Sequence, residues 1–228
     1  MDTVLKSKSI KEIINIPSIN DKINLSVEQE KALYEYLLLL SPEGFLRQRF
    51  ITEKEYFASL TGNRHAIASL PHITLANFIL SSHKQIDVVP ILKQIAYDAP
   101  KLRIVFENYA WFPFHTMYIN VKYKVSIKQL VRKITKGIKN HIKADKNKYP
   151  HHFILTPHLT VCKGLSLEEY IKSEIEYSGL TFSDSMIAKY MILLRRPIDR
   201  PEKYQEVGRF DFGGPESCDT TIQLKLPF

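Results

Sequence analysis

The chain has 228 residues, of which 44% are hydrophobic and 25% charged, and its net charge is +8. These values are ordinary for a soluble protein of one large domain or two small lobes, and no apolar run approaches the roughly 18 residues that a membrane-spanning helix needs. The N-terminus lacks the continuous apolar core of a secretory signal, and the two cysteines predict neither a disulfide framework nor a zinc site. We therefore expect a cytoplasmic protein that enters no membrane.

The first half of the chain alternates strand-like and helix-like segments. Residues 1–25 are polar and irregular, so we expect an N-terminal extension followed by a single domain over residues 26–228. Ser26 with Gln29 predicts a capped helix at the start of this domain. Pro90 is expected in the first turn of a later helix, where its missing N–H costs nothing. Hydrophobic periodicity predicts strands at 34–41, 72–80, 101–112 and 116–123, and helices at 43–60 and 86–96.

The second half repeats this alternation. Ser126 with Gln129 predicts the cap of a further helix, and Ser166 with Glu169 predicts another that runs to about residue 176. The first of these two helices has its apolar residues on one face, namely Ile127, Leu130, Val131, Ile134, Ile138 and Ile142. Strands are predicted at 158–162, within 180–196 and at 220–226, and loops at 143–157 and 197–217, the latter with a strand beginning inside it.

Two segments of the chain share a short string of residues. "PHITL" occupies 71–75 and "PHLTV" occupies 157–161, so the two histidines are 86 positions apart. Each string opens a similar order of strand, helix and strand, over 72–123 and 158–196. We interpret this order as an ancient duplication that produced two lobes.

The alternation of side chains along a strand separates the polar from the apolar residues of each string. His72 and Thr74 share one face, whereas the aliphatic residues beside them face a core beneath helices. His158 and Thr160 are arranged in the same way, and Cys162 shares their face as a small packing residue. If a pseudo-twofold axis relates the lobes, the two histidines face each other across a cleft.

Two imidazoles that titrate near neutral pH suit the cleavage of a phosphodiester. One ring takes a proton from the attacking oxygen and the other protonates the leaving oxygen, while threonine hydroxyls bind the non-bridging oxygens. This chemistry requires neither a metal nor a cofactor. We take His158 as the base and His72 as the acid, an assignment that pseudo-symmetry alone leaves open.

The paired strings resemble the signature of the two-histidine (2H) phosphoesterase superfamily, which includes bacterial 2′-5′ RNA ligases and RNA 2′,3′-cyclic phosphodiesterases. The resemblance covers roughly residues 34–226. It implies an α+β fold of two pseudo-symmetric lobes, with antiparallel sheets around a central cleft and helices outside. It implies His72 and His158 as the catalytic pair, with Thr74, Thr160 and Lys163 as phosphate-binding residues.

The activity that the resemblance implies is metal-independent hydrolysis of 2′,3′-cyclic phosphates of RNA or nucleotides, with 2′-5′ ligation as the reverse reaction. We expect a monomer whose partner is this substrate. Tyr118 and Tyr190 are candidates for stacking on a base, although strand aromatics are more often part of a core. The histidines, taken singly, would be read as structural residues.

A different class of function is suggested by residues 122–148, which hold ten Lys or Arg and one Asp. Such a cluster suits RNA, so the alternative is a non-catalytic RNA-binding module that uses the same cleft. The simpler interpretation is a solvated helix face.

Overall fold

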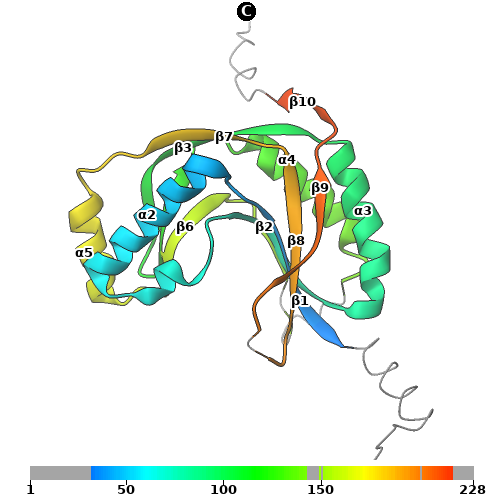
Figure 1. The fold of residues 1–228 in the computed structure, drawn as a ribbon, viewed down its shortest axis with the longest axis horizontal. Coiled ribbons are helices and arrows are strands. Elements are labelled where there is room, and N and C mark those ends of the chain that lie inside the picture. The colour runs from blue at the N-terminus through cyan, green and yellow to red at the C-terminus, as the bar shows by residue number, and fades with distance from the viewer. Residues whose placement is uncertain (1–31, 143–148, 150, 201, 218–228) are drawn as a thin grey trace, which may run out of the picture.

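The fold is built on one large, almost entirely antiparallel sheet, seen in a computed structural model that describes residues 32–142, 149, 151–200 and 202–217 (Figure 1). The strands are β1 (Leu33–Leu40), β2 (Ile73–Ser81), β3 (Pro100–Phe112), β4 (Thr116–Val121), β5 (His152–Phe153), β6 (His158–Lys163), β7 (Ser183–Ala188), β8 (Tyr190–Pro197), β9 (Gln205–Asp211) and β10 (Gly214–Ser217). Their order is β10-β3-β4-β6-β2-β1-β8-β9, with β5 paired to β2 and β7 to β3. Only β10, which pairs with β3, runs parallel to its neighbour among these strands.

The sheet divides into two lobes at its centre, where β6 meets β2. We call β2, β1, β8 and β9 the β2 lobe, and β6, β4, β3 and β7 the β6 lobe. The predicted bilobal α+β fold is therefore confirmed. The lobes do not coincide with the two halves of the sequence, however, because β3 and β4 follow β2 in the chain and yet join the β6 lobe, while β8 returns to pair with β1.

Helices cover each lobe from outside. The helices are α2 (Gly44–Thr61), α3 (Gln85–Tyr97), α4 (Val125–Ile138) and α5 (Leu167–Tyr177), with short 3-10 segments η2 (Arg64–Ala68) and η3 (Ser82–Lys84). α2 packs on β6 and α5, whereas α4 packs on β2 and α3, so the two pairs lie on opposite sides of the molecule (Figure 1).

Close packing fixes these helices on the sheet. The Phe50 ring of α2 lies 4.8 Å from Phe106 and 5.3 Å from Phe182, and all three side chains are buried. Burying one such side chain contributes roughly 1.5–3 kcal/mol. On the other lobe, a Cβ at Gly137 would lie 2.9 Å from side-chain atoms of both Ile91 and Ile95, so glycine lets α4 approach α3 closely.

Several details of the sequence prediction are confirmed. The apolar face of α4 is buried along its whole length. The box that caps α5 is present, because the Ser166 hydroxyl accepts from the Glu169 N–H and the Glu169 carboxylate accepts from the Ser166 N–H. The strands and helices expected between residues 34 and 123, and the strand at 158–162, occur close to their expected bounds.

Other details were wrong. α3 begins at Gln85, so Pro90 lies in its second turn, on an exposed surface. α4 has Lys124 as its N-cap and Ser126 inside the helix, so the predicted cap does not form. The loop predicted at 197–217 contains β9 and β10. β9 has two apolar residues, the partly buried Val207 and the buried Phe210, which are three residues apart and so do not follow a strand's period of two; it forms a strand by pairing with β8.

Some expectations concern residues outside the described part of the chain. These are the extension at 1–25, the helix at Ser26, residues 143–148 and 150 of the loop predicted at 143–157, and the strand at 220–226. The described part of that loop contains the short strand β5, which was not predicted. Within the described residues, no helix combines the length and apolar character needed to cross a membrane.

Candidate active site

The two Pro-His-x-Thr strings lie side by side at the junction of the lobes. Ile73 of β2 pairs with Leu159 of β6 in an antiparallel bridge, and both side chains are fully buried toward the helices. The histidine and threonine on either side of these two residues therefore face the other side of the sheet. All four of them are half-buried: His72, Thr74, His158 and Thr160. Continuing the register by one residue in each direction sets each histidine across from the threonine of the other strand.

Both histidines are anchored in the same way. Nδ1 of His72 lies 2.8 Å from the carbonyl oxygen of Leu70, and Nδ1 of His158 lies 2.7 Å from that of Thr156. In both strings a proline separates this carbonyl from the histidine, and it holds the preceding residue in an extended conformation. The proline of the motif thus presents the carbonyl that orients the ring.

This anchor selects the tautomer of each ring. A carbonyl oxygen can only accept, so Nδ1 carries the proton and Nε2 presents its lone pair. Neither Nε2 bonds to another group of the described residues. Both rings are therefore ready to exchange a proton through Nε2 with a bound molecule.

The surroundings of the two rings differ. Burial lowers the pKa of His72, and the nearby charges of Lys54, Lys163 and His158 lower it further, against the opposing hydrogen bond from Leu70. The effect of His158 agrees with the pairing of Ile73 with Leu159, which sets the two motif strands side by side.

His158 has an aromatic environment instead. Its ring lies 5.0 Å from both the Phe112 and the Tyr118 rings. Burial lowers its pKa, and Lys124 is the one described cation that adds to this effect. The His158 ring therefore contacts two aromatic rings, whereas the His72 ring is under the influence of two lysine charges, those of Lys54 and Lys163.

The two threonines have hydroxyls that no other described residue engages, which leaves them available to a ligand. The backbone of Thr160 is held from the helix side, because the Lys54 ammonium donates to its carbonyl oxygen at 3.3 Å. Lys163, at the end of β6, is exposed, and its charge acts on the His72 ring. The structure thus places His72, Thr74, His158 and Thr160 together at the junction of the lobes, with Lys163 three residues beyond Thr160 at the end of β6.

Lys54 is a residue of this site that the sequence analysis missed. It lies on α2 between Phe50 and Phe57, in line with the buried stripe of that helix, and it is 4% exposed. A lysine in register with an apolar stripe was the available signal, because such a position is normally filled by an aliphatic side chain.

The two candidate stacking tyrosines have different positions. Tyr118 contacts His158 and lies 4.5 Å from the Phe112 ring, so it belongs to the site. Tyr190 lies in a separate hollow on β8, where its hydroxyl bonds to Glu43 and the Arg209 guanidinium lies 4.3 Å from its ring centre. No described contact joins Tyr190 to either histidine.

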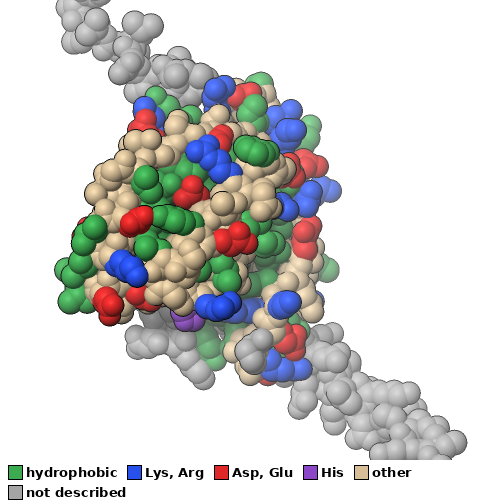
Figure 2. Space-filling model, turned by 60° about the vertical axis from the view of Figure 1, so that its left-hand side comes forward, with side chains coloured by type: hydrophobic (Ala, Val, Ile, Leu, Met, Phe, Trp, Pro, Cys, Tyr) green, Lys and Arg blue, Asp and Glu red, His purple; other side chains and the backbone are tan. Residues whose placement is uncertain are grey.

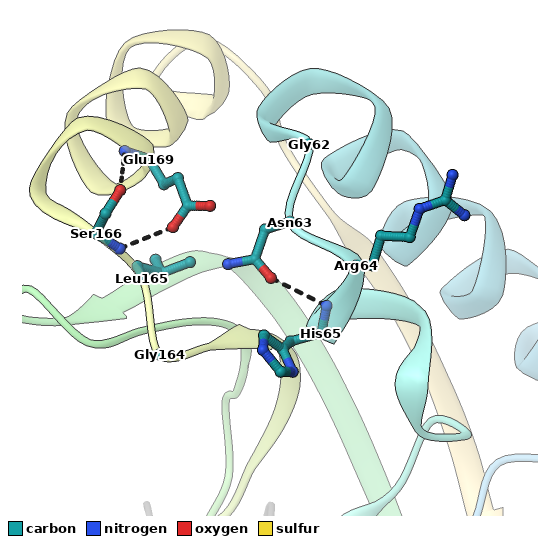
Figure 3. Close-up of a pocket in the computed structure, with 8 residues that line it drawn as sticks. All are labelled: Gly62, Asn63, Arg64, His65, Gly164, Leu165, Ser166 and Glu169. Carbon is teal, nitrogen blue, oxygen red and sulfur yellow. Dashed lines mark hydrogen bonds between the residues drawn. The ribbon is translucent and has the colours of Figure 1, made fainter.

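A second hollow, of about 630 Å³, opens beyond the end of β6 (Figure 3). It lies between the segment after α2 and the start of α5, and none of its lining residues belongs to the two motifs: Gly62, Asn63, Arg64, His65, Gly164, Leu165, Ser166 and Glu169. The close-up shows Asn63 bonded to the His65 N–H and Glu169 engaged in the cap of α5.

Cys162 was expected on the same face of its strand as His158 and Thr160. It is buried in the core instead, so it does not share their half-buried face.

A protein-family model described as the 2′-5′ RNA ligase superfamily matches residues 53–183. The chain belongs to this superfamily, and the resemblance to two-histidine phosphoesterases is confirmed. A search of curated proteins found no match.

Solved structures with the same fold come from two bacteria. E. coli LigT in its apo form superposes with a TM-score of 0.57 at 14% identity, over 79% of this chain and 98% of LigT. LigT complexed with phosphate gives 0.54 at 12% identity over the same shares. The protein TT0787 of Thermus thermophilus gives 0.54 at 13% identity, again over 79% and 98%. At these identities the similarity establishes the fold.

Proposed function

We propose that the protein is a phosphodiesterase that opens 2′,3′-cyclic phosphates of RNA or of nucleotides by acid–base catalysis with His72 and His158. The observation that supports this most directly is the pairing of the two strings on adjacent strands, with both rings anchored through Nδ1. Acid–base catalysis across one phosphorus atom requires two such groups with free, opposed nitrogen atoms.

In the proposed reaction, one Nε2 takes a proton from water as the water oxygen forms a bond to phosphorus. The bond from phosphorus to one ribose oxygen breaks, and the other histidine, which begins as the imidazolium with a proton on each nitrogen, gives its Nε2 proton to that oxygen. The product is a phosphate monoester on the neighbouring ribose oxygen. The hydroxyls of Thr74 and Thr160, with the ammonium of Lys163, would bind the non-bridging oxygens as their charge grows.

The charges around the rings favour one assignment of roles. Two lysines, Lys54 and Lys163, lower the pKa of His72, whereas one, Lys124, lowers that of His158, and the repulsion between the two imidazoles acts on both rings. A base must be unprotonated before reaction, and an acid must be protonated. This favours His72 as the base and His158 as the acid, the reverse of the order taken from the sequence. Ligation of a 5′-hydroxyl to a cyclic phosphate would use the same groups in the same roles, with the 5′-hydroxyl in place of water as the nucleophile.

Incubation with 2′,3′-cyclic AMP in the presence of EDTA tests the proposal. We expect a nucleoside monophosphate product, and we expect each of His72→Ala and His158→Ala to lower kcat by about 10²–10⁴. His83→Ala, a histidine on η3 outside the motifs, is the matched control and should leave turnover unchanged. Full turnover in either motif variant would contradict the proposal.

An RNA-binding role without catalysis is the second candidate. The exposed side of α4 and its N-cap carry Lys124, Lys128, Arg132, Lys133, Lys136 and Lys139, and none of these forms an ion pair with a described carboxylate. Lys124 also acts on His158, so this basic side begins at the candidate site. On the face shown in Figure 2, by contrast, positive and negative side chains are interspersed.

Salt dependence separates the two roles. A binding module would hold single-stranded RNA with an affinity that falls steeply with salt, by about 0.7 in log K per log salt for each phosphate contacted, and would show no turnover. Charge-removing substitutions at Arg132 and Lys136 should flatten that slope. Turnover of a cyclic mononucleotide that is insensitive to these two substitutions would favour the enzyme.

A further inference from the structure

Lys54 is the one charged residue among the buried polar residues of the described chain, the others being Asn63, Thr116 and Ser173. Taking an ammonium out of water costs several kcal/mol, and a leucine or methionine would fill the same stripe of α2 without that cost. A charge kept at such a position points to a role beyond packing.

The contacts of Lys54 lie at the junction of the two motif strands. Its ammonium donates to the carbonyl of Thr160, the residue directly after the Ile73–Leu159 bridge that joins the lobes. No described carboxylate forms an ion pair with it. Its charge is therefore not neutralised by a described partner, and it acts on whatever lies across the sheet.

His72 is one group on which this charge acts. The described groups whose charges reach the His72 ring are Lys54 from α2, and Lys163 and His158 from β6. Burial lowers the pKa of Lys54 to about 8, so the amine remains mostly protonated at neutral pH. The adjacent Cys162 thiol has a pKa raised to about 11 by burial, so it supplies no negative charge.

We propose that Lys54 is a positioning residue that holds the Thr160 strand at the lobe junction and, as a buried cation behind His72, reserves that histidine as the base. The inference rests on the proposed function, and it identifies the residue that gives the two similarly anchored histidines different roles as base and acid. The same cation would attract an anionic phosphate into the cleft, because its field is weakly screened in the interior.

Two substitutions separate the charge from the hydrogen bond. Lys54→Met removes both, whereas Lys54→Gln removes the charge and keeps an N–H donor for the Thr160 carbonyl. Lys172→Met, on the exposed side of α5, is the control. The readouts are the pH dependence of kcat/KM on 2′,3′-cyclic AMP and the titration of the His72 ring by nuclear magnetic resonance.

Both Lys54 variants should move the acid limb of the profile, and the His72 titration, upward by about one pH unit. The basic limb should stay in place, and kcat should fall further in Lys54→Met than in Lys54→Gln. Lys172→Met should match the unsubstituted protein.

An unmoved acid limb in Lys54→Gln, or a shift confined to the basic limb, would overturn the proposal. The His72 titration is read in the folded protein and does not depend on turnover. If the unsubstituted protein failed to open cyclic phosphates, a raised His72 pKa in Lys54→Gln would still show that Lys54 sets this ring, and an unmoved pKa would show that it does not.

Discussion

The two motif strands share a backbone design and differ in what surrounds their histidines. In both, a proline presents a carbonyl oxygen that anchors Nδ1 two residues later. The charges of Lys54, on the helix side of the sheet, and of Lys163 act on His72, while His158 contacts the rings of Phe112 and Tyr118. The same backbone arrangement thus anchors both rings in the same way, and the elements packed around them make the rings chemically unequal.

The largest effect should come from removing both rings at once. If His72 and His158 act on one phosphorus atom in one step, the double variant His72→Ala/His158→Ala should be about as slow as the slower single variant. Rates on 2′,3′-cyclic AMP for the four proteins measure this. Losses that multiply, so that the double variant falls by the product of the two single losses, would mean that the two strands act independently.

The pH profile tests how the unequal surroundings act. In the free protein the pKa of each histidine lies below its ordinary value of 6.5, because burial and nearby cations disfavour the imidazolium. The acid limb of kcat/KM reports the base and the basic limb reports the acid, so both limbs should be displaced downward and the optimum should lie below pH 6.5. Bound phosphate carries negative charge and raises both pKa values, so the kcat profile should lie at higher pH. A kcat/KM that rises steadily to high pH would contradict this mechanism.

The smallest effect concerns the aromatic side of the comparison. Tyr118→Leu should raise KM for cyclic AMP by about five- to tenfold, because one stacked base is worth roughly 1–3 kcal/mol and Phe112 remains as a partner. Tyr190→Leu is the control, since that ring lies with Glu43 and Arg209 in a separate hollow. Equal effects of the two substitutions on KM would show that Tyr118 does not stack on the base of the substrate.

Most of the candidate site could be predicted because its residues come from two short strings in regular strands. Alternation along a strand correctly separated His72 and Thr74 from the buried Ile73. The repeat predicted that the two histidines face each other across a cleft, and it did not predict that β2 and β6 pair directly. The burial of Cys162 broke the expected alternation. The pairing of β6 with β4 is irregular between Met117 and Tyr118, which removes the strict alternation at that end of the strand.

The remaining features depend on tertiary contacts that local patterns do not record. Lys54 acts on His72 from a helix that precedes β2 and packs on the opposite lobe. β9 has two apolar residues, Val207 and Phe210, at a spacing that does not predict a strand, and it forms one by pairing with β8. Strand pairing likewise places β3 in the β6 lobe and β8 in the β2 lobe. The two halves of the sequence therefore predicted two lobes without predicting which strands each lobe contains.

The central claim is that two imidazoles share one phosphate, and titration with inorganic phosphate tests it most directly. The Nε2 resonances of His72 and His158 would be followed by nuclear magnetic resonance at fixed pH and ionic strength, with sulfate-free buffer as the reference. The account predicts that both resonances move along one binding curve, with a single Kd and with both pKa values raised. Movement of one ring alone, or two curves with different Kd values, would contradict it.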